Sequence, residues 1–236
     1  MVLTASTKVA TMPSLDPSLI RLFQLISPGL PTGAFSYSQG LEWAVEEGWV
    51  HDRESLGKWL DEVMVHCLGM VDIPILGLMY LACREGDMQM LDARCDLLLA
   101  CRESREFLLE EGQRGRAMVV LLAGLGVVND GRWKKVLSRS QLAGFAYAAE
   151  AWGIELRLAA IGYLFAWLEN QVLTGVKIIP LGQTAGQQLL LELGGKIDLV
   201  VKHGLALSEE SIGASAPALA IASMLHENQY TRLYRS

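Results

Sequence analysis

The stretch Asp52-Arg-Glu-Ser-Leu-Gly-Lys-Trp-Leu-Asp-Glu-Val-Met-Val-His-Cys-Leu68 indicates most clearly how this chain folds. Its large apolar residues recur at intervals of three and four, which places them on one face of an α-helix. They are Leu56, Trp59, Leu60, Val63, Met64, Cys67 and Leu68. Asp52 stands at the expected N-cap, because its carboxylate can accept the free amide protons of the first turn. The stretch predicts a helix with one buried face.

The same periodicity recurs along the rest of the chain. A second apolar stripe at 154–172 is formed by Ile154, Leu158, Ile161, Phe165, Leu168 and Val172. Further helices are predicted at 16–27, 38–48, 73–85, 88–101, 103–125, 138–152, 183–193, 195–206 and 209–227, with prolines and glycines at their boundaries. No strand-like alternation is sustained, and no linker rich in Pro, Gly or Ser divides the chain. The sequence therefore predicts an all-α fold, a single-domain bundle of roughly ten helices that is irregular and not a coiled coil.

The two ends of the chain are expected to lie outside this bundle. Residues 1–15 are small, polar and interrupted by proline, which predicts a flexible N-terminal tail before an all-helical domain at 16–226. Residues 227–236 carry no helical pattern of their own. We expect this C-terminal segment to be loose alone and to become ordered against a partner.

Composition argues against a nucleic-acid or membrane partner. The formal charge of the 236 residues is −6, whereas a nucleic-acid-binding protein needs a basic surface. The longest strongly apolar stretches reach about half of the roughly 20 residues of a membrane span. We expect no signal peptide, because residues 1–15 lack an apolar core of the needed length. We expect a soluble, cytoplasmic protein.

The distribution of charge and hydrophobicity leaves room for protein partners. Residues 41–111 hold 16 of the 26 acidic side chains but 6 of the 20 basic ones, so this region is either a solvated helix surface or one that attracts a basic partner. Hydrophobic residues make up 51% of the chain and charged residues 19%. Such a composition indicates either a thick helical core or apolar surface that partner chains cover.

Signatures of enzymes, nucleotide sites and metal sites are missing from the sequence. No P-loop is present, and Tyr230 stands where the zinc-protease pattern that starts at His226-Glu227 requires its second histidine. The four cysteines lack ligand spacing and fall among apolar residues, which is typical of small buried hydrophobes in a reducing compartment. The sequence predicts no catalytic residue, no cofactor and no metal, so the protein is not expected to be an enzyme.

Polar clusters nevertheless interrupt the apolar sequence. The loop 27–40 is long for a helix connection, which favours a functional loop over one that only caps the next helix. Arg102 and Arg105 open a helix whose acidic residues, including Glu106 and Glu110, could be a solvated face with Arg102–Glu106 and Glu110–Arg114 pairs. Glycines 112 and 115 inside that helix suggest the close approach of another backbone.

Two further clusters point to partners. Asn170, Gln171 and Lys177 interrupt apolar runs, and if buried they form either an interface, a polar internal path or an internal hydrogen-bond network. The C-terminal segment concentrates tyrosine and arginine, the residue types that dominate binding hot spots. We interpret it as a partner-binding tail.

Seven segments, taken in order, resemble the family of urease accessory protein F (UreF) over nearly the whole chain from about residue 19. They are Ser27 to Glu42, Asp72-Ile-Pro74, Arg102-Glu-Ser-Arg105, Gln113-Arg-Gly-Arg116, Trp167-Leu-Glu-Asn-Gln171, Val176 to Gln187 and His226 to Ser236. Two positions depart from the family pattern: Arg114 stands where methionine is usual, and Tyr234 where phenylalanine is common.

The resemblance implies an all-helical cytosolic protein that dimerises and joins accessory protein D, called H in some organisms. Together they would recruit the GTPase, accessory protein G, and load nickel into apo-urease. The family's role is that of a scaffold and chaperone, described as modulating the GTPase and helping to form a passage for nickel.

Together with the polar clusters, the resemblance predicts a set of partner-binding residues. They are Phe35, Ser36, Tyr37, Gln39, Glu42, Arg102, Arg105, Asn170, Gln171, Lys177, Gln183, Gln187, His226, Glu227, Tyr230, Arg232, Leu233, Tyr234 and Arg235.

Two other hypotheses remain open at this stage. The protein could be a GTPase activator that donates an arginine finger, for which Arg102, Arg105, Arg232 and Arg235 are eligible by residue type. More distantly, it could be a small-molecule enzyme that uses Lys177 among amides.

Overall fold

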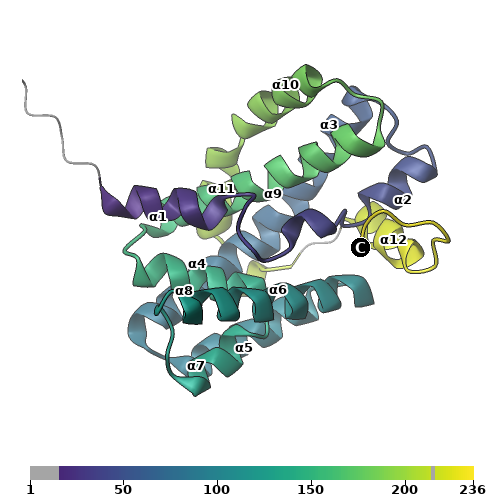
Figure 1. Ribbon diagram of the computed structural model, residues 1–236. Coiled ribbons are helices and arrows are strands. Elements are labelled where there is room, and N and C mark those ends of the chain that lie inside the picture. The colour runs from purple at the N-terminus through teal and green to yellow at the C-terminus, as the bar shows by residue number, and fades with distance from the viewer. Residues whose placement is uncertain (1–15, 214–215) are drawn as a thin grey trace, which may run out of the picture.

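The computed structural model describes residues 16–213 and 216–236, so the predicted N-terminal tail at 1–15 lies outside the described residues. The described residues form helices and no strand (Figure 1). The elements are α1 (Pro17–Ile26), η1 (Ala34–Ser36), α2 (Leu41–Glu46), α3 (Arg53–Glu62), η2 (Val63–Asp72), α4 (Ile73–Glu85), α5 (Met88–Ala100), α6 (Arg105–Gly124), α7 (Gly131–Leu137), α8 (Gln141–Ala151), α9 (Leu156–Ile178), α10 (Gln183–Gly194), α11 (Ile197–Leu205), η3 (Glu209–Ser211) and α12 (Pro217–His226). The predicted all-α, irregular single-domain bundle is confirmed.

Two apolar helices organise the core. Helix α4 packs against α5, α8, α9 and α11, and nine of its residues are buried. Helix α9 has 23 residues and contacts α1, α10 and α11. Helix α12 closes the bundle at the C-terminal end by packing on α2 and α6 (Figure 1). Segments near both ends of the described chain therefore meet the middle of the sequence at α6.

A π-helix joins two helices that the sequence predicted to be separate. The N–H of Ile73 bonds to the carbonyl of Leu68, and this i→i−5 pattern defines η2 as a wide π segment. Pro74 then lies in the first turn of α4, where a missing N–H costs little. The predicted boundary at Pro74 is wrong, because the helix runs from 53 to 85 without a break.

This continuous helix is long and apolar enough to cross a membrane by length and composition alone. However, 72% of its most apolar window is buried inside the fold, as in the core helix of a soluble protein. The apolar pattern predicts two separate helices here, at 52–68 and 73–85, so the predicted length is too short.

Three further helical segments differ from the predictions. Helix α7 was not predicted, because only Val136 and Leu137 are buried on this short segment. The predicted continuous helix at 209–227 is wrong: among the described residues of this range only η3 and α12 are helical, since Gly213 has a φ of 130° and Pro217 begins a new helix. Helix α9 continues beyond 172 to Ile178.

Hydrogen bonds from capping side chains explain where helices α3 and α6 start. Asp52 caps α3 as predicted, with its Oδ1 2.8 Å from the N–H of Ser55. Ser104 caps α6, its Oγ lying 3.1 Å from the N–H of Phe107.

The predicted close approach at Gly115 is confirmed, because a Cβ there would lie 2.7 Å from the Ser138 carbonyl oxygen. The prediction for Gly112 is wrong, since its neighbour is only the Arg116 side chain.

Candidate functional site

Helix α6 carries three glutamates whose side chains are buried. Glu106, Glu110 and Glu111 are all buried, although they lie on the helix that the sequence suggested could have a solvated acidic face. That interpretation is wrong because α8 and α12 pack on two sides of α6 and the loop before α2 covers a third. Buried carboxylates need partners, so they organise two hydrogen-bond networks.

The first network, which we call the interior network, is centred on Arg102. Its two Nη atoms donate to the Asp72 carboxylate at 3.0 and 2.7 Å, and its Nε donates to Glu111 at 3.0 Å. Tyr163 adds a hydrogen bond from its hydroxyl to Asp72 at 2.9 Å. Burial alone would lower the pKa of Arg102, but the two carboxylates raise it well above its usual value. The predicted Arg102–Glu106 pair is therefore wrong, and Arg102 is fixed as a buried cation.

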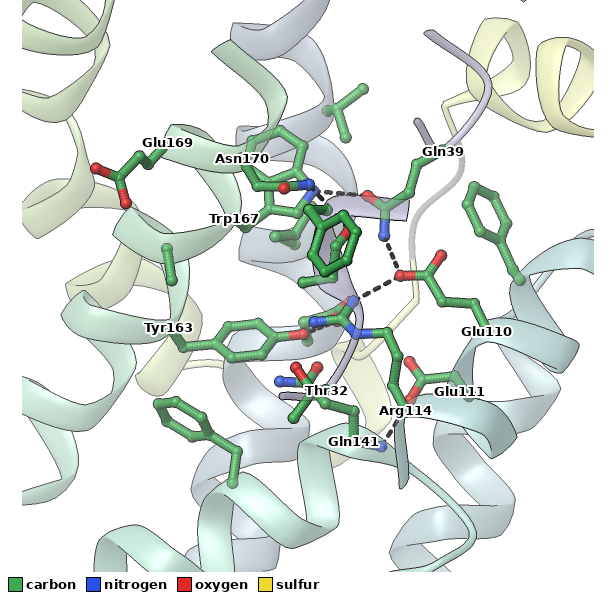
Figure 2. A pocket seen from close by; sticks show the side chains of 18 of the residues that line it. Thr32, Gln39, Glu110, Glu111, Arg114, Gln141, Tyr163, Trp167, Glu169 and Asn170 are labelled. Carbon is green, nitrogen blue, oxygen red and sulfur yellow. Dashed lines mark hydrogen bonds and ion pairs between the residues drawn. The ribbon is translucent and has the colours of Figure 1, made fainter. Parts of the chain in front are cut away.

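A second group of polar side chains, which we include in the interior network, lies between α6 and the loop (Figure 2). Glu110 accepts from Arg114 at 2.5 Å, as predicted, and from Nε2 of Gln39 at 2.9 Å. The Gln39 carbonyl oxygen in turn accepts from Nε1 of Trp167 at 2.7 Å and lies 3.5 Å from Nε2 of Gln171. Burial raises the pKa of Glu110, which its pairing with Arg114 opposes. Gln39 thus links the loop to both α6 and α9.

The interior network lines a cavity of about 180 Å³ beneath the loop 27–40. Figure 2 shows Gln39, Tyr163 and Trp167 around this space, with apolar side chains between them. Cys67 also lines it, but burial raises the pKa of this thiol to about 11, so it is protonated at neutral pH. Within the described part of the chain, no group of three or more His, Cys, Asp or Glu side chains could hold a metal ion.

The second network, which we call the tail network, is centred on His226 at the end of α12. This imidazole is fully buried, with Nδ1 2.8 Å from Glu106 and Nε2 3.1 Å from Glu42. The Glu42 carboxylate also accepts the main-chain N–H groups of Leu233 and Tyr234, at 2.7 and 3.0 Å. Arg232 donates to the second oxygen of Glu106 at 2.8 Å. Two buried carboxylates therefore hold both the histidine and the tail.

The geometry determines the charge of His226. A neutral imidazole has one donor and one acceptor nitrogen, whereas both nitrogens here face carboxylate oxygens. Only the protonated ring can donate to a carboxylate from both nitrogens, so this arrangement favours the imidazolium form of His226. Burial alone would lower the pKa of His226, but its hydrogen bonds to Glu106 and Glu42 raise it above the usual value of 6.5.

The last residues of the tail return to the loop 27–40. The N–H groups of Ser38 and Gln39 both donate to the main-chain oxygen of Ser236, at 2.5 and 2.9 Å. The N–H of Arg235 donates to the Ser36 carbonyl at 2.8 Å. Gln39 adopts a left-handed backbone with a φ of 55°, a conformation that costs about 1 kcal/mol and is offset by these contacts. Ordering of the tail by a partner stays a prediction, but its backbone already has hydrogen-bond partners within its own chain.

Most of the predicted partner-binding residues surround these two networks. Tyr37 donates to Gln113 at 2.8 Å, and Asn170 donates to the Ala34 carbonyl at 3.3 Å. Glu227 accepts from the N–H of Arg105 at 3.1 Å. The side chains of Phe35, Tyr230, Leu233 and Arg235 are exposed. Loop, helix and tail residues that are far apart in sequence thus share one region.

Three predicted residues lie apart from this arrangement. Lys177 is exposed at the edge of the cavity, so the burial considered for it from sequence is wrong. Gln183 and Gln187 are exposed on α10, and neither makes a side-chain hydrogen bond to any described residue. The structure does not bring α10 into either network.

The predicted set of partner-binding residues left out several residues that the networks depend on. They include Asp72, Glu106, Glu110, Glu111, Gln113, Arg114, Tyr163 and Trp167. The available signal was Gly115: a close backbone contact on α6 implies that the neighbouring carboxylates are enclosed as well. Asp72 stood inside a recognised segment, but nothing local indicated that it would meet Arg102.

Comparisons with known proteins give a consistent result. The model of the UreF family matches residues 50–194. The urease accessory protein UreF of Pseudomonas entomophila (strain L48) is 48% identical over 221 residues, which cover 94% of this chain and 99% of that protein. The proteins of the same description from Alcanivorax borkumensis and Marinomonas sp. (strain MWYL1) are 44% identical over 227 residues and 40% identical over 233 residues. The first of these alignments covers 94% of this chain and the second 99%, and each covers 99% of the related protein.

Proposed function

The chain belongs to the UreF family of urease accessory proteins, and from this premise we propose that it is a non-enzymatic scaffold for nickel insertion into apo-urease. Its general role is in urease maturation. In the proposed role it works in the cytoplasm as a homodimer, binds accessory protein D (or H), and with it recruits the GTPase, accessory protein G.

The observation that carries this proposal is the way the tail is held. Its backbone is fixed by Glu42 and by the loop, while Tyr230 and Leu233 are 103% and 76% exposed. Large apolar side chains on an ordered segment are expensive to leave in water and lose little entropy on binding. Such a surface is suited to hold a partner and needs no reaction centre.

The test replaces the exposed tail side chains and keeps the hydrogen bonds behind them. We expect the double variant Tyr230→Ala, Leu233→Ala to lose at least about tenfold in affinity for accessory protein D, since hot-spot residues contribute about 2 kcal/mol or more. The helical content should not change, because the Leu233 N–H that Glu42 accepts is retained.

A matched control removes apolar surface elsewhere. Leu191 and Leu199, on α10 and α11, are 81% and 71% exposed. The double variant Leu191→Ala, Leu199→Ala should bind accessory protein D normally. If the tail variant also binds at wild-type affinity in a calorimetric titration, the tail assignment is wrong.

The second candidate function is activation of the GTPase by an arginine finger. Arg102 is unsuited to this role, because Asp72 and Glu111 enclose its guanidinium. Arg105 and Arg235 are exposed, and neither guanidinium forms an ion pair with a described residue. Substituting each with alanine separates the hypotheses: a finger loses GTP turnover with complex formation intact, whereas an anchor loses complex formation.

The third hypothesis, an enzyme that uses Lys177, finds little support. A catalytic lysine is usually activated by burial in an apolar pocket, and Lys177 is exposed. A metabolite-binding screen on the purified chain tests the remaining possibility, and we expect it to give no hit.

A further inference from the structure

A surface hollow lies where α6, the loop and the tail meet. Its volume is about 230 Å³, and it is separate from the cavity beneath the loop. Arg105 and Gln113 line one wall from turns of α6 that are two apart, while Arg232 and Arg235 line the other from the tail. Tyr37, Glu106, Leu109 and Glu227 complete it. We call these eight residues the arginine hollow.

Hydrogen-bond donors outnumber acceptors in the arginine hollow. The Gln113 carbonyl oxygen already accepts from Tyr37 at 2.8 Å and lies 3.4 Å from Nη1 of Arg235, which leaves its amide N–H₂ group as a donor. Arg105 donates no side-chain hydrogen bond to any residue in 16–213 or 216–236. An excess of oriented donors is satisfied by an acceptor group on a ligand.

The charges lead to the same conclusion. Among the residues that line the hollow, three arginines face two carboxylates, Glu106 and Glu227. Both carboxylates are engaged: Glu106 binds His226 and Arg232, and Glu227 accepts from the N–H of Arg105. The hollow therefore carries one uncompensated positive charge on a chain whose formal charge is −6.

We propose that the arginine hollow binds a single carboxylate side chain, aspartate or glutamate, of a partner protein. This inference rests on the proposed function, since it names the chemistry that one partner presents to the tail. Guanidinium groups recognise carboxylates through two parallel hydrogen bonds. The Arg105 guanidinium donates to no described residue, and Arg235 donates only from Nη1, to Gln113 at 3.4 Å, which leaves its Nε and Nη2 groups for a ligand.

The charge balance favours a carboxylate over a phosphate. One carboxylate neutralises the hollow, whereas a phosphate group with a charge of about −1.5 to −2 would leave the hollow with a net negative charge. Arg232 also has limited freedom to turn toward a larger anion, because Glu106 holds its Nη1 at 2.8 Å. The occupant is therefore a monoanion on a flexible side chain.

The test titrates the full chain with a short probe and follows the arginine side chains by NMR. The probe is acetyl-Gly-Glu-Gly-amide at low ionic strength, with acetyl-Gly-Gln-Gly-amide as the neutral comparison. We expect the Nε–H signals of Arg105 and Arg235 to shift and saturate with the glutamate peptide only. The signal of Arg132, whose partner is Asp130 on the surface of α7, should not move.

Three variants make the expectation quantitative. Arg235→Gln should weaken binding of the glutamate peptide about fivefold, as expected for the loss of one charge-assisted hydrogen bond. Glu227→Gln keeps an oxygen for the Arg105 N–H but removes a negative charge, so it should strengthen binding. Arg132→Gln is the matched control and should leave the affinity unchanged.

Two results would overturn the proposal. One is equal binding of the glutamate peptide by wild type, Arg105→Gln and Arg235→Gln. The other is inorganic phosphate binding more tightly than the peptide and displacing it, which would make the hollow a phosphate site. Because the isolated chain is used, these outcomes are independent of the Tyr230 and Leu233 test. Failure of the hollow and failure of the proposed function can therefore be distinguished.

Discussion

The Nδ1 atom of His226 lies 2.8 Å from the Glu106 carboxylate, although the two residues are 120 positions apart and both are buried. This contact joins the end of α12 to the first turn of α6. Since the second Glu106 oxygen binds Arg232, the same carboxylate also holds the tail. His226, between two glutamates, is thus the centre of the hydrogen-bond network that holds the tail.

Removing the positive charge of His226 should destabilise the fold. His226→Gln can still form hydrogen bonds, but it leaves Glu42 and Glu106 without their shared cation. Losing one partner of a buried ion pair costs about 3–5 kcal/mol, so we expect a lower midpoint in urea-induced unfolding. The control His66→Gln changes an exposed histidine and should alter the unfolding free energy by less than about 0.5 kcal/mol.

The stability contributed by His226 should fall with increasing pH. Its pKa is raised in the folded protein, so above pH 6.5 the folded state holds a proton that the unfolded state releases. The groups that face the imidazole are Glu42 from α2 and Glu106 from α6, with Arg232 behind Glu106. The contribution is complete below pH 6.5 and is lost as the pH rises through the raised pKa.

Unfolding free energies of wild type and His226→Gln, measured from pH 6 upward, test this. The difference between the two proteins should shrink as the pH increases. A difference that stays constant, or grows, would contradict the assignment of the imidazolium.

Arg102 should be more important for stability than for direct binding. Arg102→Ala leaves Asp72 and Glu111 as buried, uncompensated carboxylates, which costs about 3–5 kcal/mol. For a chain of this size we expect the melting temperature to fall by at least about 6 °C in calorimetry. Arg132→Ala, which breaks an exposed pair, should shift it by no more than about 2 °C.

Replacing each of two glycines on α6 with alanine should change the unfolding free energy in opposite directions. Gly115→Ala places a methyl group 2.7 Å from the Ser138 carbonyl oxygen, so overpacking should cost about 1–3 kcal/mol. Gly112→Ala meets only the mobile end of Arg116 and should gain up to about 1 kcal/mol from helix propensity. Chemical denaturation of the two variants provides the comparison, and equal effects would refute the close approach at Gly115.

The elements that were predictable from sequence are those set by local chemistry. The apolar stripe after Asp52 and its N-cap are properties of neighbouring residues, and both were confirmed. The π segment before Pro74 was not predictable, because it depends on how the helix continues through the core. Helix α7 was missed because too few of its residues are apolar to give a periodic signal.

The site was harder to predict than the fold for a related reason. Polar residues in a sequence do not reveal partners such as Glu42 and His226, which lie 184 positions apart. The carboxylates of α6 could be read equally well as a solvated face, and only the packing of α12 and the tail distinguishes the two cases. The family resemblance indicated which segments matter, but not which residues of those segments meet.

The buried position of Ser236 has a practical consequence for handling this protein. Its main-chain oxygen accepts hydrogen bonds from the N–H groups of Ser38 and Gln39, and the residue is 1% exposed. An affinity tag fused after Ser236 would have to begin inside the fold and would compete with these contacts. Measurements of complex formation should therefore use protein in which this junction is left unmodified.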